Sequence, residues 1–244
     1  ELTHDDHWHS YFINDGLGTS IIPSAEWKLP DGWTASELLF SAPHEFAFSG
    51  AKVYGYEGTN YFFTEITAPK SANVGDKVEF TFDSSWQVCD DSSCLPPNSQ
   101  EFTFSLTIAD TAVRNAEYTK VDDYRLQSFP TKDLPKDWKI SASETTDGIT
   151  LSIEGKLPED LEFFEYDKQI DVQATRSVTH DGDKHTFSAT RNMGNRLGGK
   201  PGPKQTNLRG ILYTASDVEG SKNHAFWIDV SFNGSAEGAA TPAA

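Results

Sequence analysis

Residues 77–109 read KVEFTFDSSWQVCDDSSCLPPNSQEFTFSLTIA. Two segments of alternating apolar and polar residues, VEFTFDSSW and EFTFSLTIA, enclose the two cysteines of the chain. Alternation with a period of two predicts half-buried β-strands. The four residues between Cys89 and Cys94 are Asp and Ser, which favour turns. The stretch therefore predicts a β-hairpin with both cysteines at its mouth.

Similar β patterns occupy most of the chain on both sides of this hairpin. Segments rich in aromatic and β-branched residues lie at 8–13, 25–29, 60–68, 137–144, 148–155, 169–178, 184–190, 207–215 and 224–232. Many short strands separated by Gly and Pro turns are typical of β-sandwiches. We therefore expect an all-β fold of two immunoglobulin-like β-sandwich domains in tandem.

The patterns also suggest where the domains begin and end. The segment DTAVRNAEYTKVDD (110–123) is the best helix candidate, and GGKPGPK lies in a predicted long mobile loop at 195–207. The C-terminal residues are small and polar, as in a linker. We expect a first domain at 1–112, a connector at 113–128, a second domain at 129–233 and a disordered tail at 234–244.

Charge and composition exclude several classes of protein. The chain has 20 Lys and Arg against 37 Asp and Glu, a net charge of −17. Nucleic acids and anionic membranes require basic surfaces, so we expect no nucleic-acid partner. An aromatic content of 12% argues against disorder. No apolar run approaches the roughly 18 residues of a membrane span. No signal peptide is recognisable, although such a segment can be removed on maturation.

The spacing of the cysteines permits a disulfide. Facing positions of an antiparallel pair lie about 4.5–5.5 Å apart at Cα, within the roughly 4.4–6.8 Å range of disulfides. A ring of about six residues removes little chain entropy, worth roughly 2 kcal/mol. Spacing alone leaves a structural and a redox-active bond equally open. Two thiolates are too few for a zinc site, and the spacing differs from that of a thioredoxin-type CxxC motif.

Asp90 and Asp91 follow Cys89 directly. Negative neighbours raise the pKa of a thiol, so the pair should be a weak spontaneous nucleophile. It is better suited to exchange with a partner that supplies the activated thiolate. This is the profile of an electron relay.

Several segments resemble a known family. WQVCDDSSCLPP (86–97), followed by EFTFSL, resembles the cysteine signature of the N-terminal periplasmic region of DsbD-type thiol:disulfide interchange proteins. HSYFINDGLGTSIIPSAEWKLPDGW (9–33) is similar to the opening segment of that family, and VYGYEG (53–58) to its cap loop. LEFFEYDKQIDVQA (161–174) and LRGILYTA (208–215) look like the second module of the ScsB-like branch.

The resemblance implies a function for the cysteines. In the family, a membrane-embedded thiol relay domain reduces this kind of domain, which then reduces thioredoxin-fold proteins of the periplasm. The chain would be the relay part of a protein-disulfide reductase, without a cofactor or metal, located in the periplasm or cell envelope. On this pattern Cys94 forms the mixed disulfide with partners and Cys89 resolves it. The four-residue spacing differs from the three or five residues of some members.

Other residues are assigned to the site as expectations. Tyr54, Gly55, Tyr56 and Glu57 would form a cap loop over the sulfurs, although the two tyrosines can also be read as edge-strand aromatics. The near-site residues are Trp86, Asp90, Asp91 and Pro96.

The N-terminus offers a weaker metal candidate. His4, His7 and His9 with Asp5 and Asp6 have the donor types that bind Cu(II) or Zn(II). The position of His9 on the predicted opening strand argues against a ligand role, and we expect no metal site. A disordered acidic arm is the simpler interpretation.

Two functions from different classes remain open. One is a redox relay through Cys89 and Cys94. The other is a structural or ligand-binding β-sandwich of the cell envelope with an inert disulfide. Their reduction potentials should differ, because structural disulfides lie below about −300 mV.

Overall fold

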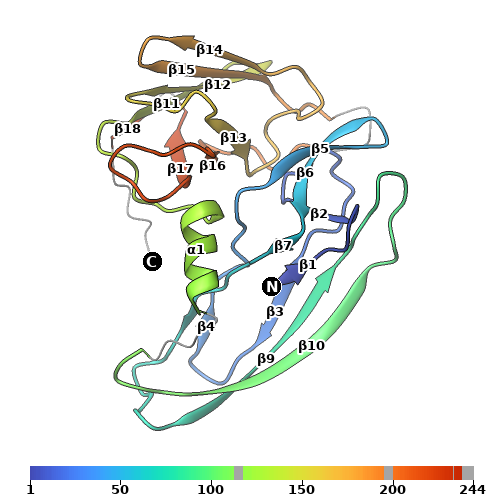
Figure 1. Ribbon diagram of the computed structural model, residues 1–244, viewed down its shortest axis with the longest axis vertical. Coiled ribbons are helices and arrows are strands. Elements are labelled where there is room, and N and C mark those ends of the chain that lie inside the picture. Colours follow the sequence, from blue (N-terminus) through green and yellow to red (C-terminus); the bar gives the residue numbers. More distant parts are fainter. Residues whose placement is uncertain (113–117, 195–199, 233, 238–244) are drawn as a thin grey trace.

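The computed structural model describes residues 1–112, 118–194, 200–232 and 234–237 (Figure 1). This part of the chain contains strands β1 to β18 and one helix, α1. The predicted all-β, tandem β-sandwich class is confirmed. In the described residues, no helix has the length and apolar character needed to cross a membrane.

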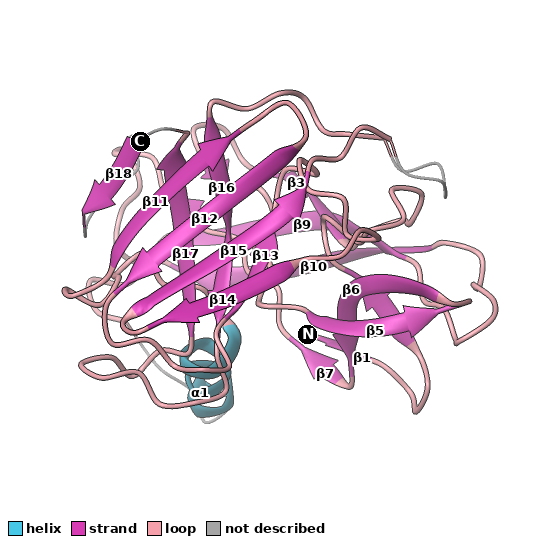
Figure 2. Cartoon of the chain, turned by 90° about the horizontal axis from the view of Figure 1, so that it is seen from above, coloured by secondary structure: helices cyan, strands magenta, loops and turns pink. Residues whose placement is uncertain are grey.

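The C-terminal half is a sandwich of two antiparallel sheets (Figure 2). The larger sheet has the order β14-β15-β12-β11-β18, and the smaller has the order β13-β16-β17. The strands are β11 (Lys139–Glu144), β12 (Gly148–Glu154), β13 (Glu162–Glu165), β14 (Ser177–Asp181), β15 (Lys184–Thr190), β16 (Asn207–Tyr213), β17 (Ala225–Ser231) and β18 (Gly234–Glu237). Alternate residues such as Ile149, Leu151 and Ile153 point into one buried cluster, as the period of two predicts.

The N-terminal half contains four smaller sheets. Their orders are β2-β6-β5, β10-β9-β3, β1-β7 and β4-β8, and all pairs are antiparallel. The strands are β1 (Leu2–Thr3), β2 (His9–Tyr11), β3 (Ser24–Lys28), β4 (Thr34–Ala35), β5 (His44–Phe48), β6 (Ala51–Glu57), β7 (Thr59–Asn60), β8 (Ile66–Thr67), β9 (Lys77–Trp86) and β10 (Asn98–Thr107).

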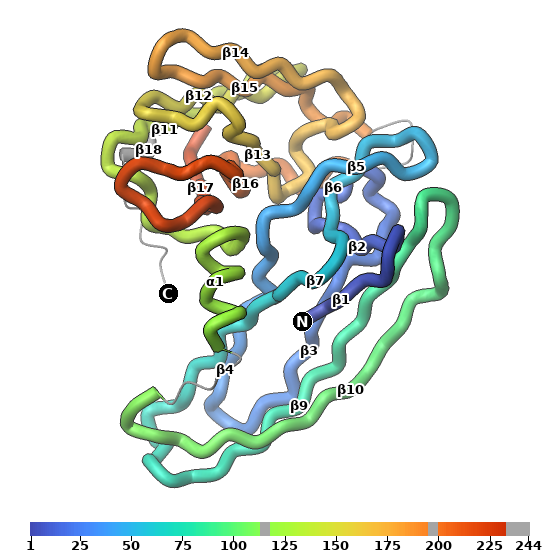
Figure 3. Tube along the Cα trace, in the orientation of Figure 1, coloured from blue at the N-terminus to red at the C-terminus, as the bar shows by residue number. Residues whose placement is uncertain are grey.

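The hairpin of β9 and β10 is the longest element of this half. Its ten cross-strand pairs run from Lys77↔Thr107 to Trp86↔Asn98. It curves along one side of the molecule, and its turn lies beside the β5–β6 hairpin (Figure 3). The sequence-predicted hairpin is therefore confirmed, with the cysteines beyond the last rung of its ladder.

Helix α1 (Tyr118–Ser128) lies between the two halves. The Tyr124 hydroxyl donates to Ser41 Oγ at 2.7 Å in the first half, and the carbonyl of Leu126 accepts from His224 N at 3.0 Å in the second. The helix was predicted at 110–123, so it starts later and ends later than expected; residues 113–117 lie outside the described part. It ends at Ser128 because Pro130 cannot continue it.

The two halves share a hydrophobic core. Phe12, Phe40 and Tyr56 of the first half belong to the same buried cluster as Phe164 and Ile211 of the second. A buried apolar cluster of this kind holds the halves together more firmly than a flexible connector would. The second half is therefore a packing partner of the first.

Two segments outside the core were predicted to be disordered or mobile. Within the predicted tail at 234–244, Gly234–Glu237 form β18 and pair with β11. Backbone pairing with an otherwise open sheet edge orders even small residues. Residues 238–244 lie outside the described part, as do 195–199 of the predicted mobile loop.

Candidate redox site

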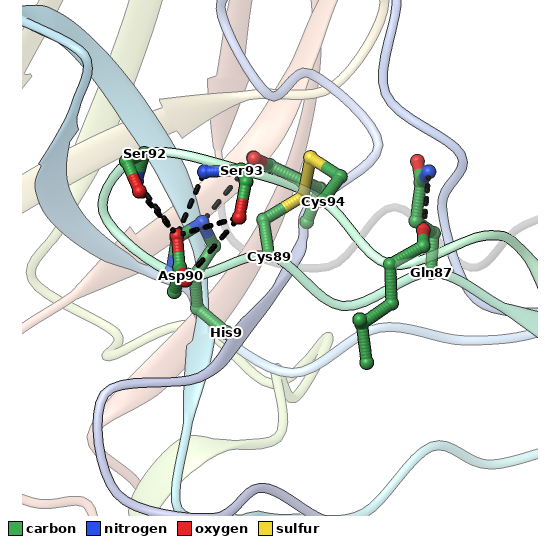
Figure 4. The surroundings of a disulfide bond; sticks show 9 residues. His9, Gln87, Cys89, Asp90, Ser92, Ser93 and Cys94 are labelled. Atoms are coloured by element: carbon green, nitrogen blue, oxygen red, sulfur yellow. Dashed lines mark hydrogen bonds between the residues drawn. A yellow bond between two sulfur atoms is a disulfide. The ribbon is translucent and has the colours of Figure 1, made fainter.

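A disulfide joins Cys89 and Cys94 at the end of the β9–β10 hairpin (Figure 4). The two Cα atoms are 3.9 Å apart. The cysteines face each other as an antiparallel bridge, and Asp90 N donates to Ser93 O at 2.8 Å inside the loop. The predicted disulfide at a hairpin mouth is confirmed.

Asp90 organises the four-residue loop. Its carboxylate accepts hydrogen bonds from the backbone N–H groups of Ser92 and Ser93 at 2.8 and 2.7 Å, and from both serine hydroxyls (Figure 4). The backbone hydrogen bond from Ser92, followed by that from Ser93, lowers the pKa of Asp90. Asp90 thus keeps a negative charge beside the disulfide.

The two sulfurs have different surroundings. Cys89 is completely buried, in a cluster with Tyr11, Leu17 and Val53. Cys94 is exposed. A thiolate from another protein can therefore reach the sulfur of Cys94, whereas Cys89 is shielded by its own domain.

Strand β2 holds a histidine against the buried cysteine. His9 and Cys89 exchange two backbone hydrogen bonds of 2.9 Å. The His9 ring centroid lies 4.3 Å from that of Phe46, and Nε2 is 3.2 Å from the Tyr11 hydroxyl. Burial lowers the pKa of His9 to about 4 despite the opposing effect of Asp91. His9 is therefore neutral at neutral pH.

From the sequence, His9 was considered only as a metal ligand, and its place at the redox site was not predicted. Its partner Cys89 is eighty positions away, and only strand pairing brings them together. Among the described residues, no group of three or more His, Cys, Asp or Glu side chains could hold a metal ion. His4 follows strand β1, and its Nδ1 donates to the Gly58 carbonyl at 2.8 Å.

The structure corrects the predicted cap loop. Tyr54, Gly55, Tyr56 and Glu57 belong to strand β6, and both tyrosines are buried. Because side chains alternate along a strand, Tyr54 and Tyr56 face away from Val53, which packs beside Cys89. The Tyr54 ring instead contacts Phe164 of the second half, at 5.1 Å between centroids.

The tip of the β5–β6 hairpin lies where the cap was expected. Phe46 and Phe48 of β5 are half-buried and pack against the cluster that contains Cys89. Ser49 N donates to Asp91 O at 3.3 Å, which joins this tip to the cysteine loop. Sequence reasoning missed these residues, although the alternating HEFAF (44–48) was a possible signal.

The remaining near-site residues frame the loop. Trp86 forms the last rung of the β9–β10 ladder and is half-buried, while Pro96 is exposed beyond Cys94. Between them, Gln87 Nε2 donates to the Leu95 carbonyl at 3.0 Å (Figure 4). The pairing therefore continues irregularly past Trp86 and positions both cysteines.

Comparisons with known proteins place the disulfide in a segment that matches a known family. Residues 1–106, which include the disulfide, match the family described as thiol:disulfide interchange protein DsbD, N-terminal. Among solved structures, the chain is similar to the N-terminal periplasmic domain of ScsB from Proteus mirabilis, with a TM-score of 0.62 and 13% identity over 94% of this chain and 84% of that chain. A search of curated proteins gives no match. The resemblance seen in the sequence is confirmed: residues 1–106 match the DsbD N-terminal family, and the chain shares the fold of the N-terminal periplasmic domain of ScsB.

Proposed function

We propose that this chain is an electron-relay module of the periplasm that works through a reversible Cys89–Cys94 disulfide. Its electron donor is a membrane-embedded thiol relay domain, and its acceptors are thioredoxin-fold proteins. The observation that carries the proposal is the unequal exposure of the two sulfurs within a segment that matches a thiol:disulfide interchange family.

The proposed reaction has two exchange steps. The Cys94 thiolate of the reduced protein attacks the partner's disulfide, which forms a Cys94–partner disulfide and releases one partner thiolate. The Cys89 thiolate then attacks the Cys94 sulfur, restores the Cys89–Cys94 disulfide and releases the second partner thiolate. Two electrons pass to the partner, which leaves as a dithiol. The exposed sulfur meets the partner, and the buried sulfur completes the reaction.

Single-cysteine variants test these roles. Cys89→Ser, incubated with an oxidised thioredoxin-fold protein, should accumulate a mixed disulfide through Cys94. Cys94→Ser should accumulate far less, because Cys89 is buried. Non-reducing electrophoresis and mass spectrometry measure both products. Equal trapping by the two variants would contradict the assigned order.

The reduction potential separates the relay from a structural disulfide. A relay should lie between the potentials of thioredoxin and protein disulfide isomerase, about −270 to −180 mV, and an inert bond below about −300 mV. A potential below this limit, together with no trapping by either variant, would favour the structural or ligand-binding sandwich. The exposed Phe102 and Phe104 of β10 would then be the surface to test for a ligand.

A further inference from the structure

His9 and Cys89 form a cross-strand pair in the buried part of the site. Each donates a backbone N–H to the carbonyl of the other, at 2.9 Å. Directly opposite residues of an antiparallel pair project their side chains to the same face, with Cβ atoms about 4.5–5.5 Å apart. The imidazole and the Cys89 side chain therefore project to the same face of the strand pair, where Tyr11 and Phe46 also lie.

This position addresses a difficulty in the second exchange step. Cys89 must become a thiolate before it can attack Cys94, but a buried thiol beside carboxylates resists ionisation. Cys89 is inaccessible to solvent, and Asp90 and Asp91 follow it. A neighbouring base would remove the proton where water has no access.

We propose that the imidazole of His9 accepts the proton of the Cys89 thiol as Cys89 closes the disulfide. The S–H bond of Cys89 breaks, its proton moves to a ring nitrogen, and its electron pair forms the new bond to the Cys94 sulfur. The bond from Cys94 to the partner breaks, and the partner leaves as a thiolate. The imidazolium then returns its proton to solvent. The inference rests on the proposed function and names the base of its second step.

The surroundings of His9 suit this role. Burial keeps the ring neutral at neutral pH, so its free ring nitrogen can act as an acceptor, and the Tyr11 hydroxyl at 3.2 Å orients it. The aromatic walls of Phe46 and Phe48 exclude water from it. Neighbouring carboxylates stabilise the protonated imidazolium form of His9, whereas a neighbouring histidine destabilises it. The ionisable groups facing His9 are Tyr11 on its own strand, Glu57 opposite it on β6, Asp90 and Asp91 of the cysteine loop, and His4.

Rapid-mixing kinetics of the full chain test the proposal. The reduced protein is mixed with glutathione disulfide, and mass spectrometry of acid-quenched samples follows the Cys94–glutathione adduct and its closure. We expect His9→Asn to leave adduct formation within about twofold of wild type but to slow closure near pH 7 by about 100-fold, the lower end of general-base effects.

The pH profile distinguishes a base from a packing residue. Wild-type closure should be nearly independent of pH above the pKa of His9, because the base is then fully neutral. Closure in His9→Asn should rise about tenfold per pH unit, because it depends on spontaneous thiol ionisation. The matched control is His185→Asn, a buried histidine of the second half, which should keep the wild-type profile. A wild-type rate and profile in His9→Asn would overturn the proposal.

A second measurement covers the case in which His9→Asn does not fold. In Cys94→Ser, which keeps His9, thiolate absorbance and the His9 ring resonances are titrated together. We expect both signals to follow the same steps, as for a coupled pair. Independent titrations would overturn the proposal.

The small-molecule probe separates this inference from the proposed function. Loss of exchange with thioredoxin-fold proteins, with His9-dependent closure still seen with glutathione, would contradict only the proposed partners. Exchange with those proteins at the wild-type rate and pH profile in His9→Asn would contradict only the role of His9.

Discussion

Gly55 is the residue at which the site tolerates no side chain. A Cβ added at this position would overlap the carbonyl oxygen of Ser10 and lie 3.1 Å from the ring of Phe46. The Ser10 oxygen belongs to the backbone of the neighbouring strand, so it cannot move aside. The absence of a side chain lets β2 and Phe46 approach β6 and close the cluster around Cys89.

We expect Gly55→Ala to lower the free energy of unfolding by about 2 kcal/mol or more, as overpacking and backbone displacement do. Urea unfolding of the oxidised protein measures the loss. Gly148→Ala is the control, because a Cβ there meets no atom closer than 3.4 Å. Equal stability of the two variants would contradict the tight packing of β2 against β6.

The direction of the side chains along β6 explains why Tyr54 and Tyr56 do not cover the sulfurs. Tyr54 and Tyr56 occupy the face of β6 opposite Val53, so their rings lie in the core shared with the second half and away from Cys89. The motif VYGYEG shows the alternation but not which of its two faces meets the cysteines. Both faces of β6 are buried, so burial alone could not have decided which face meets the cysteines.

At the scale of elements, two hairpins build the site. The β9–β10 hairpin carries the disulfide, and the β5–β6 hairpin covers the buried side of it with Phe46 and Phe48. The hydrogen bond from Ser49 N to Asp91 O joins their tips. Access to the buried sulfur of Cys89 therefore depends on how closely the two hairpins remain packed.

Phe46→Ala should open this cover. We expect the disulfide of the variant to be reduced by dithiothreitol several-fold faster than in wild type, because the ring no longer shields His9 and Cys89. Alkylation and mass spectrometry of quenched samples give the rate. Phe104→Ala, on the exposed strand β10, should leave the rate unchanged. Equal acceleration by both substitutions would point to general destabilisation.

At the scale of the whole molecule, a buried carboxylate joins the halves. Glu165 of β13 accepts a hydrogen bond from Asn14 Nδ2 of the first half at 2.9 Å, and others from the backbone N–H groups of Asp167 and Gln169. Burial raises its pKa to about 7, although the backbone hydrogen bonds oppose the shift. Folding therefore favours its protonated form.

This shift predicts how stability depends on pH. The pKa of Glu165 is higher in the folded than in the unfolded state, so its contribution is fully present below about pH 4.5 and is lost as the pH rises to about 7. Relative to Glu165→Gln, which cannot ionise, the wild type should lose about 3 kcal/mol over this range. Urea unfolding of both proteins at several pH values measures the difference. Parallel profiles would show that Glu165 does not titrate in this range.

The chain alone determined the all-β class, the hairpin and its disulfide, because these depend on local alternation and on two cysteines five positions apart. Tertiary structure decided which sulfur is buried, that His9 pairs with Cys89, that Phe46 rather than Tyr54 or Tyr56 covers the site, and that Glu165 meets Asn14. These features join residues far apart in sequence. Periodicity identifies a strand and its two faces, but only packing against other strands decides what each face meets.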